Sequence, residues 1–502
     1  MKNNNLDQHN HDQDFIGQES EEHAVRIAKV KKMREQGIEP WPEMLRPSIQ
    51  SATLLDCFQE NDFAEHSLSG RIVAIRLHGR AGFAHIVDES GKIQLYFNES
   101  EMGETLFQFF TEMIDLGDII WAQGILFKTQ RGEITLRVQK FSLQSKCLHP
   151  LPEKFHGLTD VETRYRQRYL DLITNDASKK ILQQRSQIVQ ACRQFLFDHK
   201  YLEVETPMLH PIAGGAAAKP FVTHHNALNS DFYLRIAPEL YLKRLVVGGF
   251  NRVFEINRNF RNEGISTRHN PEFTMLELYT AYENYEYGMD FTEKLIQSIC
   301  FTALGSYQVT FGNHEIDFEK PFKKILLRDA VLQYTDLTES DLTDSGLDIF
   351  LEKHRIKLPK TNMSLAEKLY LVFDECVESQ LIEPTFMIGF PIEVSPLAKR
   401  DDKDKTLAAR GELFVAGMEL ANLFNELNDP FDQAERFHDQ VAAKASGDAE
   451  AHDYDADFIR ALEYGLPPTV GIGIGIDRLV MLLTGSTSIK DVILFPTLKK
   501  RN

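Results

Sequence analysis

The sequence predicts an α+β protein in which a small β-barrel comes first and a larger antiparallel sheet flanked by helices follows. The chain has 502 residues, of which 42% are hydrophobic, and this is enough for more than one hydrophobic core. Short β-rich runs separated by glycine-marked turns extend from Ser67 to about Leu143. Two alternating segments within residues 251–282 predict a long antiparallel hairpin. We therefore expect two or three domains.

The composition restricts the class of protein. The five cysteines are scattered without a C-x-x-C pair, which predicts buried thiols in a reducing cytoplasm rather than a disulfide framework or a zinc site. No apolar run reaches about 18 residues, and the polar first residues do not resemble a signal peptide. We therefore expect a cytoplasmic protein with no membrane partner. The net charge of −18 does not exclude a nucleic acid, because one basic groove on an acidic protein can still bind phosphates.

The first 65 residues divide into two segments. Residues 1–16 are polar and predict a disordered tail. Residues 17–65 are expected to be helical, because apolar residues such as Val25 and Met33 alternate with lysines and arginines before Gly37 stops the helix. The basic side chains could pack on the next domain or contact a phosphate backbone. The sequence leaves both interpretations open.

The strands of residues 66–148 have lengths that suit an oligonucleotide/oligosaccharide-binding (OB) fold. The open face of such a barrel stacks unpaired bases on aromatic side chains. Phe83 is a candidate for this face, although its pattern alone favours a core position. A connector follows at residues 149–178, where two early prolines and three later arginines mark a domain boundary.

The second domain is expected at residues 179–502. It opens with a helix and runs into the strand YLEVETPML, which Pro207 ends. Residues from about 305 to 390 predict a helical insertion of mixed polarity, in which no chemistry can be recognised.

The hairpin lies at the centre of this domain. From Arg252 to Arg261 apolar and polar residues alternate, and from Phe273 to Tyr279 the odd positions share one face of a second strand. The loop between the strands is polar and charged. By itself the pattern is also compatible with an ordinary solvated hairpin, since exposed ion pairs often contribute little.

Two further segments carry candidate functional residues. In GELFVAGMELANLFNELNDP the polar residues Glu412, Glu419, Asn422 and Glu426 have spacings of seven, three and four, which alone suggests a solvated acidic helix face. In GIGIGIDRLVMLL alternate glycines leave one strand face as bare backbone, which could admit a flat ring, and Arg478 begins a helix.

The order F-R-N-E, a short loop, R-H-N-P-E-F and M-L-E-L-Y resembles motif 2 of the class II aminoacyl-tRNA synthetases, and in detail it is similar to the bacterial-type lysine-specific enzymes. The resemblance extends from about Ser67 onward. GIGIGIDR resembles motif 3, and the strand ending at Pro207 resembles motif 1, which builds the dimer interface in this family. Two departures are His199-Lys200, where relatives often have a glycine, and Lys219, where an arginine is expected.

The resemblance implies a homodimer that uses ATP, L-lysine and tRNA(Lys), with two or three Mg²⁺ ions accompanying ATP. It assigns the following residues: catalytic, Arg261 and Arg478; ATP-binding, Glu263, His269, Phe273 and Arg478; lysine-binding, Gly215, Glu239, Glu277, Tyr279, Asn422 and Glu426; metal-binding, Glu412 and Glu419; anticodon-binding, Phe83, Gln94 and Glu133. Because lysine carries two ammonium groups, its pocket should contain carboxylates, and Glu426 is the residue expected to meet the ε-ammonium.

Two other functions fit parts of this pattern. One is a related enzyme that transfers lysine to a protein acceptor, but such a relative lacks the anticodon barrel. The other is a synthetase-like RNA-binding protein without catalysis. The presence of Arg261, Glu412, Glu419 and Arg478 argues against the second function.

Overall fold

The computed structural model describes residues 20–60, 63–152, 158, 160–216, 218–359, 363–446, 451 and 453–500. The predicted disordered tail at residues 1–16 lies outside these ranges. The chain forms two compact units, Met1–Leu158 and Thr159–Asn502. The first contains a barrel and the second a large sheet with helices, which confirms the predicted α+β class.

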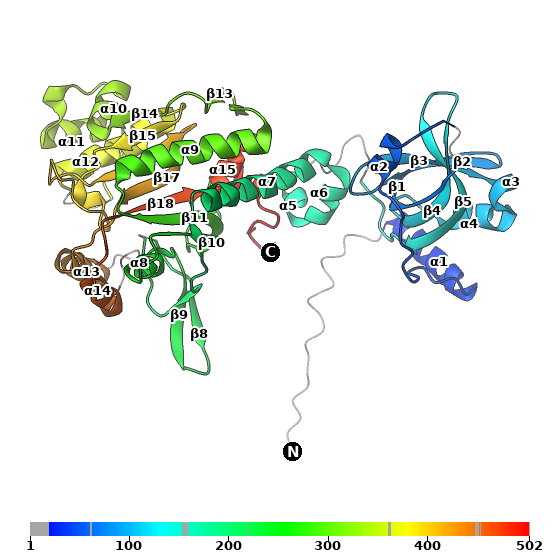
Figure 1. The fold of residues 1–502 in the computed structure, drawn as a ribbon, viewed down its shortest axis with the longest axis horizontal. Helices are drawn as coiled ribbons and strands as arrows, with labels where there is room; N and C mark the ends of the chain where they lie inside the picture. Colours follow the sequence, from blue (N-terminus) through cyan, green and yellow to red (C-terminus); the bar gives the residue numbers. More distant parts are fainter. Residues whose placement is uncertain are drawn as a thin grey trace, which may run out of the picture. The chain divides into compact units, whose positions relative to one another are not determined.

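The first unit is a closed five-stranded barrel with the order β1-β2-β3-β5-β4 (Figure 1). Its strands are β1 (Glu65–His78), β2 (Ala81–Val87), β3 (Lys92–Asn98), β4 (Ile119–Lys128) and β5 (Ile134–Ser145). Alternate residues of each strand point into one apolar core, as the period of two requires. Helices α3 (Glu99–Met102) and α4 (Glu104–Met113) follow β3, and Phe107 and Phe110 of α4 complete that core.

The predicted N-terminal helix is present as α1 (Glu21–Glu35), followed by α2 (Ser51–Asp56). The buried side of α1 includes Arg26, whereas Val25 is half exposed, so the prediction of an apolar face that includes Val25 is partly wrong. The Arg26 guanidinium donates hydrogen bonds to the carbonyls of three residues beside the barrel, and Lys29 pairs with Asp115 at 2.7 Å. Of the two open interpretations, packing on the barrel therefore accounts for these cations.

The second unit is built on an eight-stranded sheet with the order β14-β15-β16-β17-β18-β11-β10-β6. Helices α7 (Asp176–Asp198), α9 (Tyr285–Leu304) and α15 (Ile476–Thr484) cover one face (Figure 1). Further strands and helices of this unit include β6 (Leu202–Glu203), β7 (Leu209–His210), β8 (Val222–His225), β9 (Ser230–Leu234), α8 (Glu239–Val247), β16 (Arg410–Val415), β17 (Met418–Asn425), α13 (Pro430–Ala445), α14 (Ala456–Glu463), β18 (Thr469–Gly475) and α16 (Ile489–Val492).

The predicted hairpin is confirmed as β10 (Arg252–Phe260) and β11 (Glu272–Ala281), paired antiparallel along their full length. The even-numbered residues Phe254, Leu276 and Leu278 are buried in the core beneath the covering helices. Because successive side chains of a strand point to opposite faces, the odd-numbered residues of β11 face the other side of the sheet, on which α8 packs.

The segment at residues 305–390 is not entirely helical, and that part of the prediction is wrong. It contains α10 (Leu327–Tyr334), α11 (Asp344–Lys353) and α12 (Leu365–Val372), which share an apolar cluster of their own. It also contains the hairpin of β12 (Gln308–Phe311) and β13 (His314–Asp317), and the sheet strands β14 (Lys323–Leu326) and β15 (Thr385–Ile388). Each of these strands has four residues, which is too short for a clear alternation.

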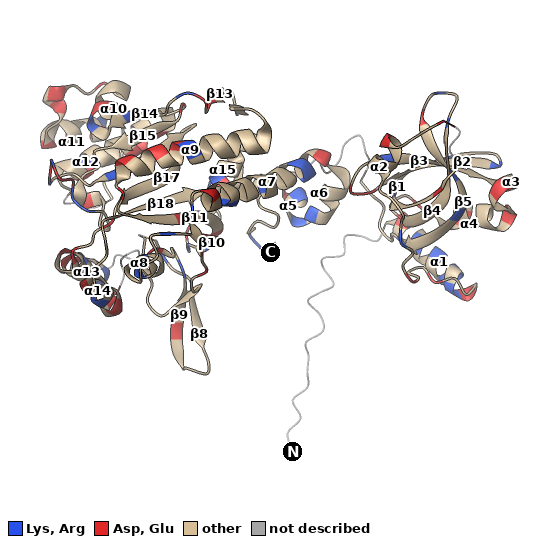
Figure 2. Cartoon of the chain, in the orientation of Figure 1, with Lys and Arg blue, Asp and Glu red and all other residues tan. Residues whose placement is uncertain are grey.

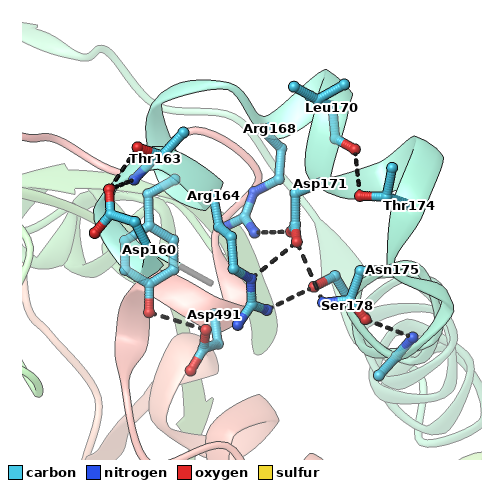
Figure 3. A network of polar contacts seen from close by, with 12 residues as sticks. Asp160, Thr163, Arg164, Arg168, Leu170, Asp171, Thr174, Asn175, Ser178 and Asp491 are labelled. Atoms are coloured by element: carbon cyan, nitrogen blue, oxygen red, sulfur yellow. Dashed lines mark hydrogen bonds and ion pairs between the residues drawn. The ribbon is translucent and has the colours of Figure 1, made fainter. Parts of the chain in front are cut away.

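The arginines of the predicted connector lie on α5 (Val161–Arg166) and α6 (Arg168–Thr174), which appear as blue segments in Figure 2. Arg164 donates to Asp171 and Ser178 (Figure 3). Arg168 is 1% exposed, pairs with Asp171 at 2.9 Å, and donates to three backbone carbonyls between residues 490 and 494. These arginines therefore fasten α5 and α6 to the C-terminal part of the second unit.

Within the described ranges, every helix is too short or too polar to cross a membrane.

Candidate active site

A cavity of about 430 Å³ lies on the face of the large sheet opposite to α7, α9 and α15. Every residue that the sequence predicted for ATP, lysine or magnesium lines it: Gly215, Glu239, Arg261, Glu263, His269, Phe273, Glu277, Tyr279, Glu412, Glu419, Asn422, Glu426 and Arg478. Lys219 does not line this cavity. The fold therefore gathers residues from β11, β16, β17, β18 and several loops into one place.

Glu412, Glu419 and Asn422 lie on strands and Glu426 directly follows the second of them, so the helix-face interpretation is wrong. Glu412 on β16 stands opposite Asn422 on β17. The two strands are joined at Ala416 and Gly417, which have φ values of 53° and 65°. Two successive positive φ values produce the tight hairpin turn in which glycine is favoured. The dipeptide Ala-Gly was the available signal for a hairpin at this point.

The glycines of β18 expose bare backbone to the cavity, as predicted, while Ile472 and Ile474 are buried in the core. A Cβ atom added at Gly471 would lie 2.0 Å from Oε1 of Glu426 and 2.8 Å from the ring of Tyr279. Even one methyl group there would displace a carboxylate of the cavity. The absence of side chains on this strand face is therefore required by the neighbouring residues of the site.

Two arginines form a cationic end of the cavity. The Arg261 guanidinium lies 5.1 Å from the centre of the Phe273 ring, and its buried Nε has no hydrogen-bond partner among the described residues. Arg478, in the first turn of α15, donates through Nη1 to the backbone oxygen of Glu419 at 2.6 Å, and its Nη2 lies 3.2 Å from Nε2 of His269. Burial and the charge of Arg478 lower the pKa of His269, so the neutral imidazole can accept this hydrogen bond.

The two carboxylates proposed for magnesium lie beside this end. Glu412 pairs with Arg410 and accepts a 3.2 Å hydrogen bond from Asn422. Burial raises the pKa of Glu412 to about 7, with Arg410 opposing and Glu419 adding to the shift. Oε2 of Glu419 lies 3.5 Å from Nη1 of Arg478. A divalent cation would relieve the repulsion between the two carboxylates, and oxygen is the ligand that Mg²⁺ prefers, so these residues fit the ion.

In the described part of the chain, no group of three or more His, Cys, Asp or Glu residues could hold a metal ion by itself. A Mg²⁺ ion held by one or two carboxylates typically completes its coordination with water molecules and substrate phosphates.

The opposite end of the cavity is acidic and buried. Glu239 and Glu277 are each 6% exposed and Glu426 is 1% exposed, and the Tyr279 hydroxyl donates to Glu277 at 3.4 Å. Burial, reinforced by the charge of Glu239, raises the pKa of Glu277 to about 8. Burial also raises the pKa of Glu426, against the opposing charge of Lys243. Buried carboxylates of this kind favour a cationic ligand, which would restore their ionised form.

The sequence analysis missed three residues that support these groups. Lys243 forms ion pairs with Glu239 and Glu426, Arg410 pairs with Glu412, and Asp477 accepts hydrogen bonds from the Thr274 amide and from Arg185. Lys243 could have been found from its position four residues after Glu239, because residues four apart share one side of a helix. Nothing in the local sequence links it to Glu426.

The three predicted anticodon residues lie together on the outside of the barrel. Ala84 and Ile86 of β2 point into the core, so Phe83 points outward and its core interpretation is excluded. Its ring lies 5.0 Å from that of Tyr96. Nε2 of Gln94 donates to Glu133 at 3.0 Å. Tyr96 and the neighbouring Phe127 extend this aromatic face and were missed by the sequence analysis.

Comparison with known protein families gives one match in each of the two units of the chain. Residues 160–499 match the family "tRNA synthetases class II (D, K and N)", and residues 66–143 match "OB-fold nucleic acid binding domain". These matches define a class II aminoacyl-tRNA synthetase fold with an anticodon-type barrel.

Individual relatives narrow the assignment. The "Lysine--tRNA ligase" of Carboxydothermus hydrogenoformans is 52% identical over 95% of this chain and 98% of its own length. The "Lysine--tRNA ligase" of Methylobacillus flagellatus is 52% identical over 96% of both chains. The chain therefore belongs to the lysine–tRNA ligase family of class II tRNA synthetases.

Proposed function

We propose that the chain activates L-lysine with ATP to form lysyl-adenylate and transfers the lysyl group to the 3′-terminal adenosine of tRNA(Lys). The observation that carries this proposal is the polarity of the cavity, which has two arginines at one end and three buried carboxylates at the other. One end suits a triphosphate and the other suits an amino acid with two ammonium groups. The names of the relatives support the same activity.

In the first step the lysine carboxylate attacks the α-phosphate of ATP, and the bond to pyrophosphate breaks. Negative charge accumulates on the α-phosphoryl group during this step. Arg261, whose Nε has no hydrogen-bond partner within the described ranges, would stabilise the α-phosphate. Arg478 would hold the γ-phosphate, while Glu263, His269 and Phe273 would hold adenine and the bent triphosphate. Glu412 and Glu419 would hold Mg²⁺, which neutralises phosphate charge when it is bound. No protein nucleophile is required.

In the second step a hydroxyl of the terminal adenosine attacks the activated carbonyl, and AMP leaves. The same preorganised cations serve the departing phosphate group. The acidic end of the cavity keeps the substrate in place during both steps. There Glu239, Glu277 and Glu426 would bind the two ammonium groups, and Gly215, Tyr279 and Asn422 would complete the walls.

Lysine is expected to be the only strong stimulator of ATP–pyrophosphate exchange among the twenty amino acids. Its second ammonium group is the feature that the buried carboxylates select, and aspartate would bring a carboxylate to a site that is already acidic. The assay measures exchange of labelled pyrophosphate into ATP with each amino acid in turn. Equal stimulation by aspartate or asparagine, or none by any amino acid, would refute the proposed function.

The barrel is proposed to read the anticodon, and Phe83→Ala tests this role. Loss of a stacking platform costs about 1–3 kcal/mol per base, so the KM for tRNA should rise by about fivefold or more, while exchange without tRNA stays near wild type. Steady-state aminoacylation measures the first quantity. Phe97→Ala is the matched control, because Phe97 belongs to the core of the same barrel. A Phe83→Ala protein that unfolds like this control would argue against the stacking role.

The homodimer is also a proposal. β6 is an edge strand of the large sheet, and the neighbouring Leu202, Leu209 and Phe250 are exposed to 46%, 44% and 47%. Of these residues Leu202 lies on β6 itself, and an exposed apolar residue on an edge strand is suited to contact with a second copy of the chain. Sedimentation equilibrium at micromolar concentration should give twice the chain mass, and a monomer would contradict the proposal. The cytoplasm, where aminoacylated tRNA is consumed, is the proposed location.

A further inference from the structure

Lys243 lies behind the acidic end of the cavity and does not line it. Its side chain is fully buried on α8, with Nζ 2.5 Å from Oε1 of Glu239 and in ion-pair contact with Oε2 of Glu426. The rings of Phe424 and Phe458 lie 5.7 and 6.0 Å from the same nitrogen. This environment removes the ammonium group from water, so its two carboxylate partners are its source of stabilisation.

The two oxygens of Glu426 have different surroundings. Oε2 forms the ion pair with Lys243, whereas Oε1 lies next to Gly471 on the glycine face of β18 and has neither an ion-pair nor a hydrogen-bond partner among the described residues. Gly471 lines the cavity. One oxygen therefore holds the protein's own ammonium group, and the other is directed toward the space where a ligand can bind.

The groups around this pair are mainly acidic. Glu239 and Lys243 come from α8, Glu426 follows β17, and Glu277 and Tyr279 come from β11. The charges of Arg235, Glu255 and Arg261 also act on the pKa of Glu277. Burial raises the pKa of both Glu239 and Glu426, and in each case Lys243 is the nearest charge that opposes the shift. Without that ammonium group the pKa of both carboxylates would rise further, and a smaller fraction of each would be ionised.

We propose that Lys243 is a positioning residue that keeps Glu239 and Glu426 ionised and oriented to receive the ammonium groups of the substrate. The proposal rests on the proposed function. It adds that the acidic pocket depends on a permanent internal cation, and that this cation sets the pH range in which lysine binds. Lys243 is not expected to touch the substrate, because it does not line the cavity and it meets Glu426 through Oε2, whereas Oε1 is the oxygen next to Gly471.

The test is Lys243→Met, which keeps the length of the side chain and removes its charge. The KM for lysine in ATP–pyrophosphate exchange should rise by about tenfold or more at pH 7, since one unit of pKa displacement is a tenfold change in the ionised fraction. The KM for ATP should change little. In the wild type, lysine affinity should increase as pH rises through about 8, where Glu277 loses its proton. In Lys243→Met this increase in lysine affinity should occur at higher pH. The difference in lysine KM between the variant and the wild type should therefore be smaller at pH 9 than at pH 7.

Lys146→Met is the matched control. Lys146 is also a fully buried lysine, and it bridges Asp115 and Asp118 in the barrel at 2.6 and 2.7 Å. Its substitution should lower thermal stability and leave the lysine KM and its pH profile unchanged. Lys243→Gln, which keeps a hydrogen-bond donor without the charge, replaces Lys243→Met if the latter does not fold. The pH dependence of its lysine affinity should be shifted to higher pH in the same way.

The outcomes separate the two hypotheses. A wild-type protein without lysine-dependent exchange would refute the proposed function itself. An active wild type, together with folded Lys243 variants whose lysine KM and pH profile match it, would refute the role of Lys243 alone. A loss of kcat at all pH values with an unchanged lysine KM would also overturn this role, because it would indicate a general structural effect.

Discussion

Arg261→Ala is expected to reduce the rate of lysyl-adenylate formation by about 100-fold or more, the scale on which a single preorganised electrostatic donor contributes. Arg261 follows β10 at the cationic end of the cavity, where its guanidinium lies against the Phe273 ring and its buried Nε has no hydrogen-bond partner among the described residues. Because negative charge grows at the α-phosphate only as the reaction proceeds, the loss should appear mainly in kcat. Arg478→Ala should show a loss of similar size.

Single-turnover formation of the adenylate from lysine and ATP measures this step directly. Arg252→Ala is the matched control, because Arg252 begins β10, the strand that ends just before Arg261, but donates to the backbone of His199 and lies over the Tyr201 ring. It should remain within a few-fold of wild type. A folded Arg261→Ala protein whose rate is also within a few-fold would show that the arginine has no part in the chemistry.

Glu426→Gln is expected to weaken lysine binding by about 30-fold or more, which corresponds to the 2–5 kcal/mol associated with truncating one partner of a buried charge pair. The amide has nearly the same shape as the carboxylate, but it cannot neutralise an ammonium group taken out of water. It also leaves Lys243 with one carboxylate instead of two. ATP affinity should change little, because the nucleotide is expected at the other end of the cavity.

Isothermal titration with lysine and with ATP separates these effects. Asp171→Asn serves as the control, since Asp171 is an equally buried carboxylate, paired with Arg164 and Arg168 away from the cavity. That substitution should lower stability without changing the Kd for lysine. Comparable losses of lysine and ATP affinity in Glu426→Gln would indicate that Glu426 has a structural or metal-linked role.

Several parts of this protein were determined by the sequence alone, because their signals are local. The alternation of β10 and β11 and the glycines of β18 depend only on which neighbours share a strand face. The same local order carries the family motifs, so the residues of the cavity could be chosen before their geometry was known. The side of the barrel to which Phe83 points, by contrast, became clear only when the core partners of β2 were known.

Only the tertiary structure shows the contacts between segments that are far apart in the chain. The spacing of Glu412, Glu419 and Asn422 fits a helix until the turn at Gly417 is seen to fold the segment into two strands. Lys200, which stands where relatives often have glycine, has a φ of 64°, a backbone conformation that the sequence does not reveal. Lys243 and Glu426 meet because α8 packs behind the cavity, and burial then gives their charges a strength that neither residue has in water. Periodicity reports the neighbours along one element, whereas burial and ion pairing depend on how all the elements pack together.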